Sequence, residues 1–451
     1  MTNNRTAAVI SLFSGALGLD LGLERAGFDI RVAVEASRFA AETIRRNRPD
    51  LPVIQKKLEK VTTGEILRRA RLRVGEAALL TGGPSCQSFS TAGQRGSLSD
   101  PRGSMFREFL RVVRQARPRF FIMENVCGVL SAAVRHRPLK KRGPGYPKLK
   151  PDEELSSAFV VLLRALRRTG YYVTFKVVNA ADFGVPQARK RLLFIGSRDG
   201  EDVRFPRPTH AAEATGARSE WVTLKEALAG LLDPQPAVNS LSRKKLRYIA
   251  RVPQGGNWRD LPVHHRRWAL GKAFVSWGGR NGFYRRLAWD RVAPSLTTRP
   301  DSKATMLIHP TEDRPLSVRE YARLQQFPDE WEFAGGVPQQ YMQIGNAVPV
   351  GLAETVGRSL WRLTLRKKKA SEARRDHVIC ADRSLVVRLL SRRNTVLNPP
   401  RMRRFGGVKV ARRWLATPST VRRNLRRMLD PDGHLQERKG TCRRRSRRRQ
   451  E

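Results

Sequence analysis

One cysteine of the chain stands in a sequence context suited to nucleophilic chemistry. Cys86 lies in a small, polar stretch, residues 82–90 (GGPSCQSFS), directly after the apolar run 77–81. A thiol with a pKa of about 8.5 is mostly protonated at neutral pH, so a nucleophile there needs N–H dipoles or cations nearby, and a loop in this basic chain offers both. We interpret Cys86 as a candidate nucleophile. The other cysteines, which we interpret as inert apolar residues, are Cys127, Cys380 and Cys442.

A carboxyl group follows another apolar run. Glu124 begins the triplet ENV, residues 124–126, after the run 120–123. A carboxyl at the end of a strand can give a proton or a hydrogen bond to a ring nitrogen. Because Cys86 and Glu124 both fall just past short apolar runs, we expect them at the one edge where α/β sheets build their sites.

The first strand-like run leads into a turn of small residues. Residues 13–18 (FSGALG) follow the run, and Glu35 ends the next one. A small-residue turn before a helix lets backbone N–H groups approach a ligand, and an acidic side chain at the neighbouring strand can accept both hydroxyls of a ribose. Together they predict a cofactor that contains a nucleoside.

Two further motifs lie later in the chain. In residues 187–191 (QARKR), alternation along an extended segment would place Gln187, Arg189 and Arg191 on one face, where guanidinium groups can hold a phosphate or a base carbonyl. Residues 343–349 (QIGNAVP) are typical of a loop that leads into a helix.

The elements that must position these residues alternate over the first two hundred positions. Short apolar runs without polar alternation are typical of strands buried on both faces of a parallel sheet, and strands alternating with helices indicate a doubly wound α/β domain. The predicted strands are 8–13, 30–35, 77–81, 120–123, 172–178 and 192–195, and the predicted helices are 18–26, 38–47, 104–115, 155–169, 317–326 and 350–365.

The remaining composition divides the chain further. Residues 198–285 are rich in Pro, Gly, Trp and Arg with little sustained period, as expected of a smaller, loop-dominated module. Regular signals return over 286–365. Residues 366–451 hold 28 Lys and Arg against 7 Asp and Glu, and we expect this basic tail to be largely disordered. The first domain is residues 1–197.

The chain as a whole is strongly basic. Its 451 residues carry 88 Lys and Arg against 40 Asp and Glu, a formal net charge of +48. Such a surface repels itself unless it meets polyanions, so nucleic acid is the expected partner and a membrane surface the second choice. Four widely spaced cysteines exclude a disulfide scaffold and a CxxC zinc pattern.

No metal and no membrane span are expected. His264 and His265 are adjacent but have no third ligand nearby in the sequence. The longest stretch without charge, residues 333–353, contains two prolines and four glycines and cannot be a membrane helix. We expect a soluble, cytoplasmic protein associated with the nucleoid. The sequence does not indicate its oligomeric state.

With all five motifs in this order, the chain resembles the bacterial-type DNA (cytosine-5)-methyltransferases from about residue 7 to 365. The resemblance implies a Rossmann-like S-adenosylmethionine-dependent methyltransferase domain, a small target-recognition domain within 198–285, and a last helix returning to the large domain. It implies Cys86 as nucleophile, Glu124 as the residue that holds and protonates the cytosine, and Arg189 and Arg191 as assisting groups supported by Gln187. The positions that it implies for the cofactor are Phe13, Gly15, Gly18, Glu35, Ser104 and Asn346.

Some positions depart from the family pattern. Ser11 stands where the family often has Asp, and Leu17 where it often has Gly. The acidic residue usually found near the adenine amino group is replaced around residues 57–59, where Glu59 is a candidate substitute. Ser85 replaces a frequent Pro beside the nucleophile.

The leading hypothesis is therefore an enzyme that methylates cytosine in double-stranded DNA, either beside a companion restriction endonuclease or alone. An RNA cytosine-5 methyltransferase of the same fold is one alternative, which the sizeable 198–285 segment disfavours. The other is a nucleic-acid binding protein with a degenerate pocket, which the presence of Cys86, Glu124 and the two arginines disfavours.

Overall fold

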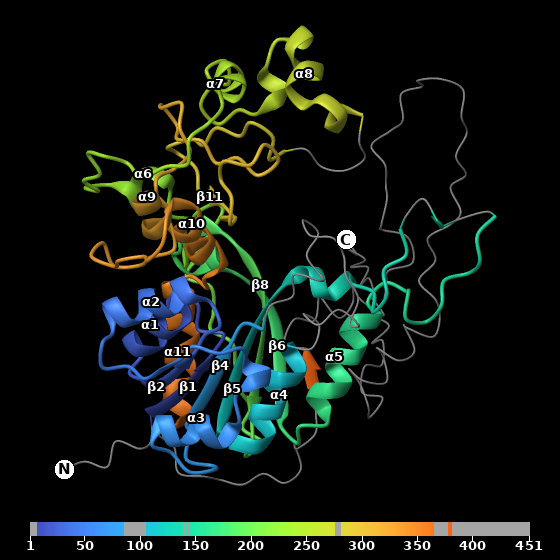
Figure 1. The fold of residues 1–451 in the computed structure, drawn as a ribbon, viewed down its shortest axis with the longest axis vertical. Helices are drawn as coiled ribbons and strands as arrows, with labels where there is room; N and C mark the ends of the chain where they lie inside the picture. Colours follow the sequence, from blue (N-terminus) through green and yellow to red (C-terminus); the bar gives the residue numbers. More distant parts are fainter. Residues whose placement is uncertain are drawn as a thin grey trace, which may run out of the picture.

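A mixed, eight-stranded sheet forms the centre of the molecule. The computed structural model describes residues 7–84, 105–138, 141–142, 145–275, 281–364 and 378–380. The strand order is β12-β6-β8-β5-β4-β1-β2-β3 (Figure 1). The strands are β1 (Ala8–Leu12), β2 (Asp29–Val34), β3 (Val53–Ile54), β4 (Leu79–Gly82), β5 (Phe120–Val126), β6 (Tyr172–Asn179), β8 (Lys190–Ser197) and β12 (Val378–Cys380).

Helices cover both faces of this sheet, as the doubly wound prediction requires. Successive strand residues point to opposite faces, so the side chains of Ile10 and Leu12 pack with one layer and that of Val9 packs with the other. The first layer contains α3 (Thr63–Ala70), α4 (Met105–Ala116) and α5 (Ser157–Arg167); the second contains α1 (Gly18–Arg25), α2 (Arg38–Asn47) and α11 (Val350–Thr364).

Two expectations about the sheet need correction. Strand β8 pairs antiparallel with both β5 and β6, so the sheet is not wholly parallel. Strand β5 continues to Val126, and β8 begins at Lys190. Glu124 and Arg191 therefore lie inside paired strands and not in the loops beside them, which gives both side chains a fixed direction.

The residues between β8 and α11 form a separate group of helices and short strands above the sheet in Figure 1. Two further apolar clusters hold this part together, one around Tyr321 and Tyr341 and one around Tyr248 and Tyr284. Its elements are β9 (His210–Ala211), β10 (Ser219–Glu220), α6 (Leu224–Leu228), α7 (Arg243–Ile249), α8 (Val263–Leu270), β11 (Ala293–Pro294), α9 (Val318–Leu324) and α10 (Val337–Asn346).

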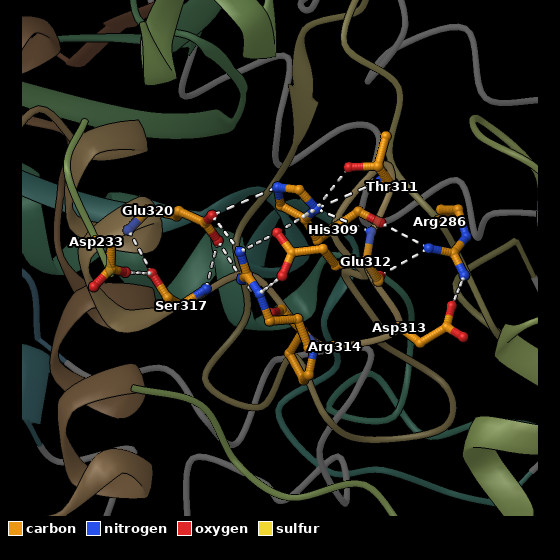
Figure 2. A network of polar contacts seen from close by, with 10 residues as sticks. Asp233, Arg286, His309, Thr311, Glu312, Asp313, Arg314, Ser317 and Glu320 are labelled. Carbon is orange, nitrogen blue, oxygen red and sulfur yellow. Dashed lines mark hydrogen bonds and ion pairs between the residues drawn. The ribbon is translucent and has the colours of Figure 1, made fainter. Parts of the chain in front are cut away.

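A polar network connects loop segments of this upper part to the start of α9 (Figure 2). A capping box begins α9, since the Ser317 hydroxyl accepts from the Glu320 backbone N–H and the Glu320 carboxylate accepts from the Ser317 backbone N–H. Arg314 donates to both Glu320 oxygens at 2.9 Å, and buried Arg286 donates to four backbone carbonyls, among them that of His309 at 3.1 Å. These carbonyls come from distant segments, so Arg286 satisfies backbone acceptors that regular secondary structure would otherwise pair.

The C-terminal segment contributes one described element. Residues 378–380 form β12, which pairs in parallel with β6 at the edge of the sheet. The expected disorder of the remaining tail concerns residues outside those that the structure describes.

Candidate active site

A carboxylate and a guanidinium group meet at the edge of the sheet where β4 and β5 end. In the antiparallel pairing of β5 and β8, Arg191 lies opposite Val126, so Glu124 and Arg191 are diagonal neighbours on one face. Arg191 Nε lies 2.7 Å from Glu124 Oε1, and each side chain is only 12% exposed. A charge-assisted bond in such a sheltered place holds the carboxylate in one orientation.

The turn that leads toward Cys86 lies against this pair. A Cβ atom added at Gly83 would stand 3.0 Å from Glu124 Oε2, so the backbone after β4 and the carboxylate are in close contact. Cys86 and Ser104 lie outside the described residues. The described part of the chain thus brings the base of the predicted nucleophile loop to Glu124.

The first strand ends beside the same edge. Leu12 pairs with Gly82 of β4 and with Val34 of β2, so Phe13, Gly83 and Glu35 leave three neighbouring strands at one level. Phe13 and Gly15 have φ values of 54° and 56° and form a tight left-handed turn. The Glu35 carboxylate accepts from the Gly15 N–H at 2.8 Å and from the Ser37 N–H at 2.7 Å.

This turn has room and hydrogen-bonding capacity for a ligand. No heavy atom of the described residues lies within 4 Å of a Cβ built at Gly15, so its outer side is open. A carboxylate offers about four lone-pair positions, of which two at Glu35 are taken by backbone N–H groups. Two hydroxyls of a ribose fit the remaining capacity.

Leu17, one of the departures from the family pattern, is accommodated with strain. It adopts a left-handed conformation with φ of 66° and caps α1. A non-glycine residue in this region costs roughly 1 kcal/mol. Its side chain is buried in the second apolar layer, which offsets part of that cost.

Gly18 packs against the residues that directly follow Asn346. A Cβ at Gly18 would lie 2.6 Å from the carbonyl oxygen of Val348, so Gly18 permits close packing against the QIGNAVP segment. Asn346 is the last residue of α10 and is exposed. The structure thus gives Gly18 a packing function and leaves Gly15 as the glycine that faces open space.

Gln187 and Arg189 lie in the interior and not beside Arg191 at the site. Arg189 is 1% exposed and donates to the carbonyls of Leu296 (2.9 Å), Gly345 (2.7 Å) and Ala347 (3.0 Å). Burial lowers the pKa of Arg189 well below its usual value. Two of these carbonyls flank Asn346, so Arg189 fixes the segment that presents that side chain.

The backbone around residues 57–59, where the family usually has an acidic residue, is held by an arginine that the sequence analysis did not identify. Glu59 lies exposed in a short 3-10 helix, Leu58–Lys60. Arg111 of α4 donates to the carbonyls of Leu58 at 3.1 Å and Val61 at 3.0 Å. Nothing in the local pattern of α4 distinguishes Arg111 from other surface arginines, so only the folded chain identifies it.

The upper part of the molecule contains an open pocket of about 400 Å³. Arg285, Arg291, Asn257 and Asn281 are among its lining residues, and guanidinium and amide groups are suited to phosphates and base edges. Trp258 and Tyr284 of the same part are only 8% and 2% exposed and belong to its core.

Within the residues that the structure describes, no group of three His, Cys, Asp or Glu side chains is arranged to hold a metal ion. No helix in the same ranges has the length and apolar composition to cross a membrane.

Comparisons with known proteins identify the family of this chain. The sequence model of C-5 cytosine-specific DNA methylases matches residues 7–362. The type II methyltransferase M.Sau96I of Staphylococcus aureus is 37% identical over 361 residues, which are 79% of this chain and 76% of that protein. M.PspPI of Psychrobacter sp. (strain TA137) is 36% identical over 368 residues, 80% of each chain.

A solved structure shares the fold. The methyltransferase EhMeth of Entamoeba histolytica superimposes with a TM-score of 0.53, covering 80% of this chain and 99% of that one, at 14% identity. At that identity the likeness concerns the arrangement of the elements alone. The match over residues 7–362, together with relatives above 30% identity, shows that this chain belongs to the C-5 cytosine-specific DNA methylase family and is a DNA cytosine-5 methyltransferase.

Proposed function

We propose that the protein transfers a methyl group from S-adenosylmethionine to C5 of a flipped cytosine in double-stranded DNA, through a covalent bond to Cys86. The observation that carries this proposal is the sheltered pair of Glu124 and Arg191, packed against the turn that begins the Cys86 loop. A carboxyl held in one direction beside a nucleophile loop suits a reaction in which a ring is attacked and protonated.

The residues around the first turn are suited to the cofactor. Glu35 would accept the ribose hydroxyls, and the backbone at Phe13 and Gly15 would approach the rest of the molecule, with Asn346 and Ser104 beside it. Gly18 would contribute by allowing the Asn346 segment to pack closely. When bound, the cofactor supplies an electrophilic methyl group on a sulfonium.

Cys86 and Glu124 would divide the chemistry of activation. The C5 of cytosine is a poor nucleophile, so addition of the Cys86 thiolate to C6 makes an electron-rich enamine at C5. A hydrogen bond or proton from Glu124 to N3 stabilises the charge that develops during this addition. Once C5 carries the methyl group, its proton leaves and the Cys86 thiolate is expelled, which restores the ring.

The two arginines would contribute in different ways. Arg191, at 2.7 Å from Glu124, orients the carboxyl and can also reach the base or its phosphate. Arg189 acts as a positioning residue, because its guanidinium group already binds three backbone carbonyls in the interior. The resemblance implied only that both arginines assist at the base and its phosphates, whereas we propose different contacts for each.

The DNA would be held by the basic surface and by the upper part of the molecule. Flipping a cytosine out of the stack costs a few kcal/mol, which phosphate contacts can offset. The pocket with Arg285, Arg291, Asn257 and Asn281 is a candidate for target recognition. Since its similar relatives are named type II methyltransferases, we also propose a companion restriction endonuclease as partner, with the protein associated with the nucleoid.

Labelling with tritiated S-adenosylmethionine tests this proposal. Wild type and Cys86→Ser would each be incubated with DNA and, separately, with RNA. We expect label in DNA from wild type alone, and a covalent adduct with an oligonucleotide containing 5-fluorocytosine. Label mainly in RNA would favour the RNA methyltransferase, and label in neither polymer would favour the binding protein with a degenerate pocket.

A further inference from the structure

A buried carboxyl group lies behind the turn that we assign to the cofactor. Asp20, in the first turn of α1, is 1% exposed. Its Oδ2 atom is 2.9 Å from the hydroxyl oxygen of Ser11 in β1, and its Oδ1 atom has no hydrogen-bond partner among the described residues. Burying a carboxyl with one bond is costly, so stability alone does not explain its presence.

Hydrogen bonds connect this carboxyl to the turn. The Ser11 hydroxyl lies 2.8 Å from the Ser14 hydroxyl. Ser14 contacts the Val34 carbonyl through its backbone N–H at 3.3 Å and its hydroxyl at 3.5 Å. The next residue, Gly15, donates its N–H to Glu35, which follows Val34. The chain thus runs from Asp20 to the two strand ends that frame the turn.

The direction of this hydrogen-bond chain depends on the proton of Asp20. Burial raises the pKa of Asp20 to about 7. A hydroxyl has one hydrogen, so Ser11 donates either to Asp20 or to Ser14. With Asp20 protonated, Asp20, Ser11 and Ser14 can each donate once in the same direction, ending at the Val34 carbonyl.

We propose that Asp20 is a positioning residue for the cofactor turn, which it holds through Ser11 and Ser14 so that the Gly15 N–H and the Glu35 carboxylate are set for the ribose. This inference rests on the proposed cofactor site. It also accounts for the hydroxyl at residue 11, because the carboxyl of this pair is supplied by α1 and not by β1.

Exchanging the two groups across the 2.9 Å contact tests the proposal. Calorimetry with S-adenosylmethionine and full-length protein would compare wild type, Asp20→Ala, Asp20→Ser, Ser11→Asp and the double variant Ser11→Asp with Asp20→Ser. We expect the single variants to weaken cofactor binding about tenfold, since Asp20→Ala removes the partner of Ser11, Asp20→Ser shortens it, and Ser11→Asp places two carboxyl groups together. The double variant conserves one carboxyl and one hydroxyl and should return to within about threefold of wild type.

Two further measurements separate positioning from a general loss of folding. Asp20→Asn keeps a hydrogen-bonding group of the same shape and should bind within about threefold of wild type. Glu24→Ala, on the same helix, removes an ion pair with Arg48 but not the hydrogen-bond chain, so it should leave cofactor affinity unchanged. In Asp20→Ala the KM for the cofactor should rise while kcat at saturation stays within about twofold.

The inference would be overturned by folded Asp20→Ala with wild-type affinity, or by a double variant that binds no better than Asp20→Ser. Wild type that binds the cofactor but labels no DNA would contradict the proposed reaction and leave this inference standing. Wild type that binds no cofactor would overturn both.

Discussion

Glu124 has its charged partner, Arg191, in the neighbouring strand. A substitution that removes only the acidic proton of Glu124 tests its part in methyl transfer. Glu124→Gln keeps the shape of the side chain but cannot supply a proton, so methyl transfer to DNA should fall about 10²-fold to 10⁴-fold. Cofactor affinity, measured by calorimetry, should not change, because Glu124 lies apart from the turn at Gly15.

The matched control for this substitution is Glu42→Gln. Glu42 is a partly exposed residue of α2 that also pairs with an arginine, Arg46. Its replacement should leave methyl transfer within about twofold of wild type, as surface pairs contribute little. Equal activity of Glu124→Gln and Glu42→Gln would contradict the assigned role of Glu124.

The protonation of Asp20 predicts a dependence of stability on pH. Its pKa is raised from an ordinary 3.8 to about 7 in the folded protein, chiefly by burial. Glu24 and Arg48, which pair with each other, also affect this pKa: Glu24 raises it and Arg48 lowers it. Helix α11 packs against α1 and carries Glu354, which is paired with Arg358. Since the folded state retains a proton that the unfolded state loses above pH 4, Asp20 stabilises most at low pH.

Comparing wild type with Asp20→Asn isolates this effect from other titrating groups. The free energy of unfolding of wild type should decline relative to the variant between pH 4 and 7, by about 4 kcal/mol in total, and the difference should be constant above pH 8. Denaturant unfolding at pH 5, 6, 7 and 8 measures it. A pH-independent difference would show that the carboxyl titrates alike in both states.

At the scale of elements, α1 and α11 are joined by an unusually close approach of their backbones. A Cβ at Gly22 would lie 2.2 Å from the Val350 carbonyl and 2.5 Å from the Ala353 Cβ atom. Gly22→Ala should therefore lower the free energy of unfolding by about 1–3 kcal/mol, because the helices must separate. Gly64→Ala in α3, whose Cβ would meet nothing closer than 3.7 Å, should be neutral or stabilising. Thermal unfolding of both variants decides the matter.

Local sequence patterns were sufficient to predict the helices whose ends are set by residues within the helix or next to it. The bounds of α2 agree with the prediction, since Ser37 caps it and Arg48-Pro49 ends it. Helix α9 lies within the predicted range 317–326 and begins with a capping box, which is also a local signal. The direction of β8 could not be predicted, because a buried parallel strand and a buried antiparallel strand can have the same apolar sequence pattern. Its pairing with β5 decides that Arg191 meets Glu124.

Contacts between distant parts of the chain account for most of what the sequence could not provide at the site. Arg189 binds carbonyls that lie more than 100 residues away, so no pattern within QARKR separates it from Arg191. Asp20 reads as an ordinary acidic residue in the first turn of a helix, and only the position of Ser11 reveals that it is buried. In both cases the surroundings of a charged group, and not its spacing, determine its role.

At the scale of the whole molecule, the distribution of charge predicts how the protein binds DNA. Residues 366–451 carry a net charge of +21, from 28 Lys and Arg against 7 Asp and Glu. Each phosphate contact that the tail makes adds about −0.9 to the slope of log affinity against log salt concentration. Deleting residues 370–451 should therefore flatten that slope by several units, while the choice of target sequence stays the same, because we assign recognition to the upper part of the molecule. Binding titrations from 50 to 300 mM salt with a target duplex and a shuffled duplex measure both quantities. An unchanged slope would show that the tail does not reach the DNA backbone.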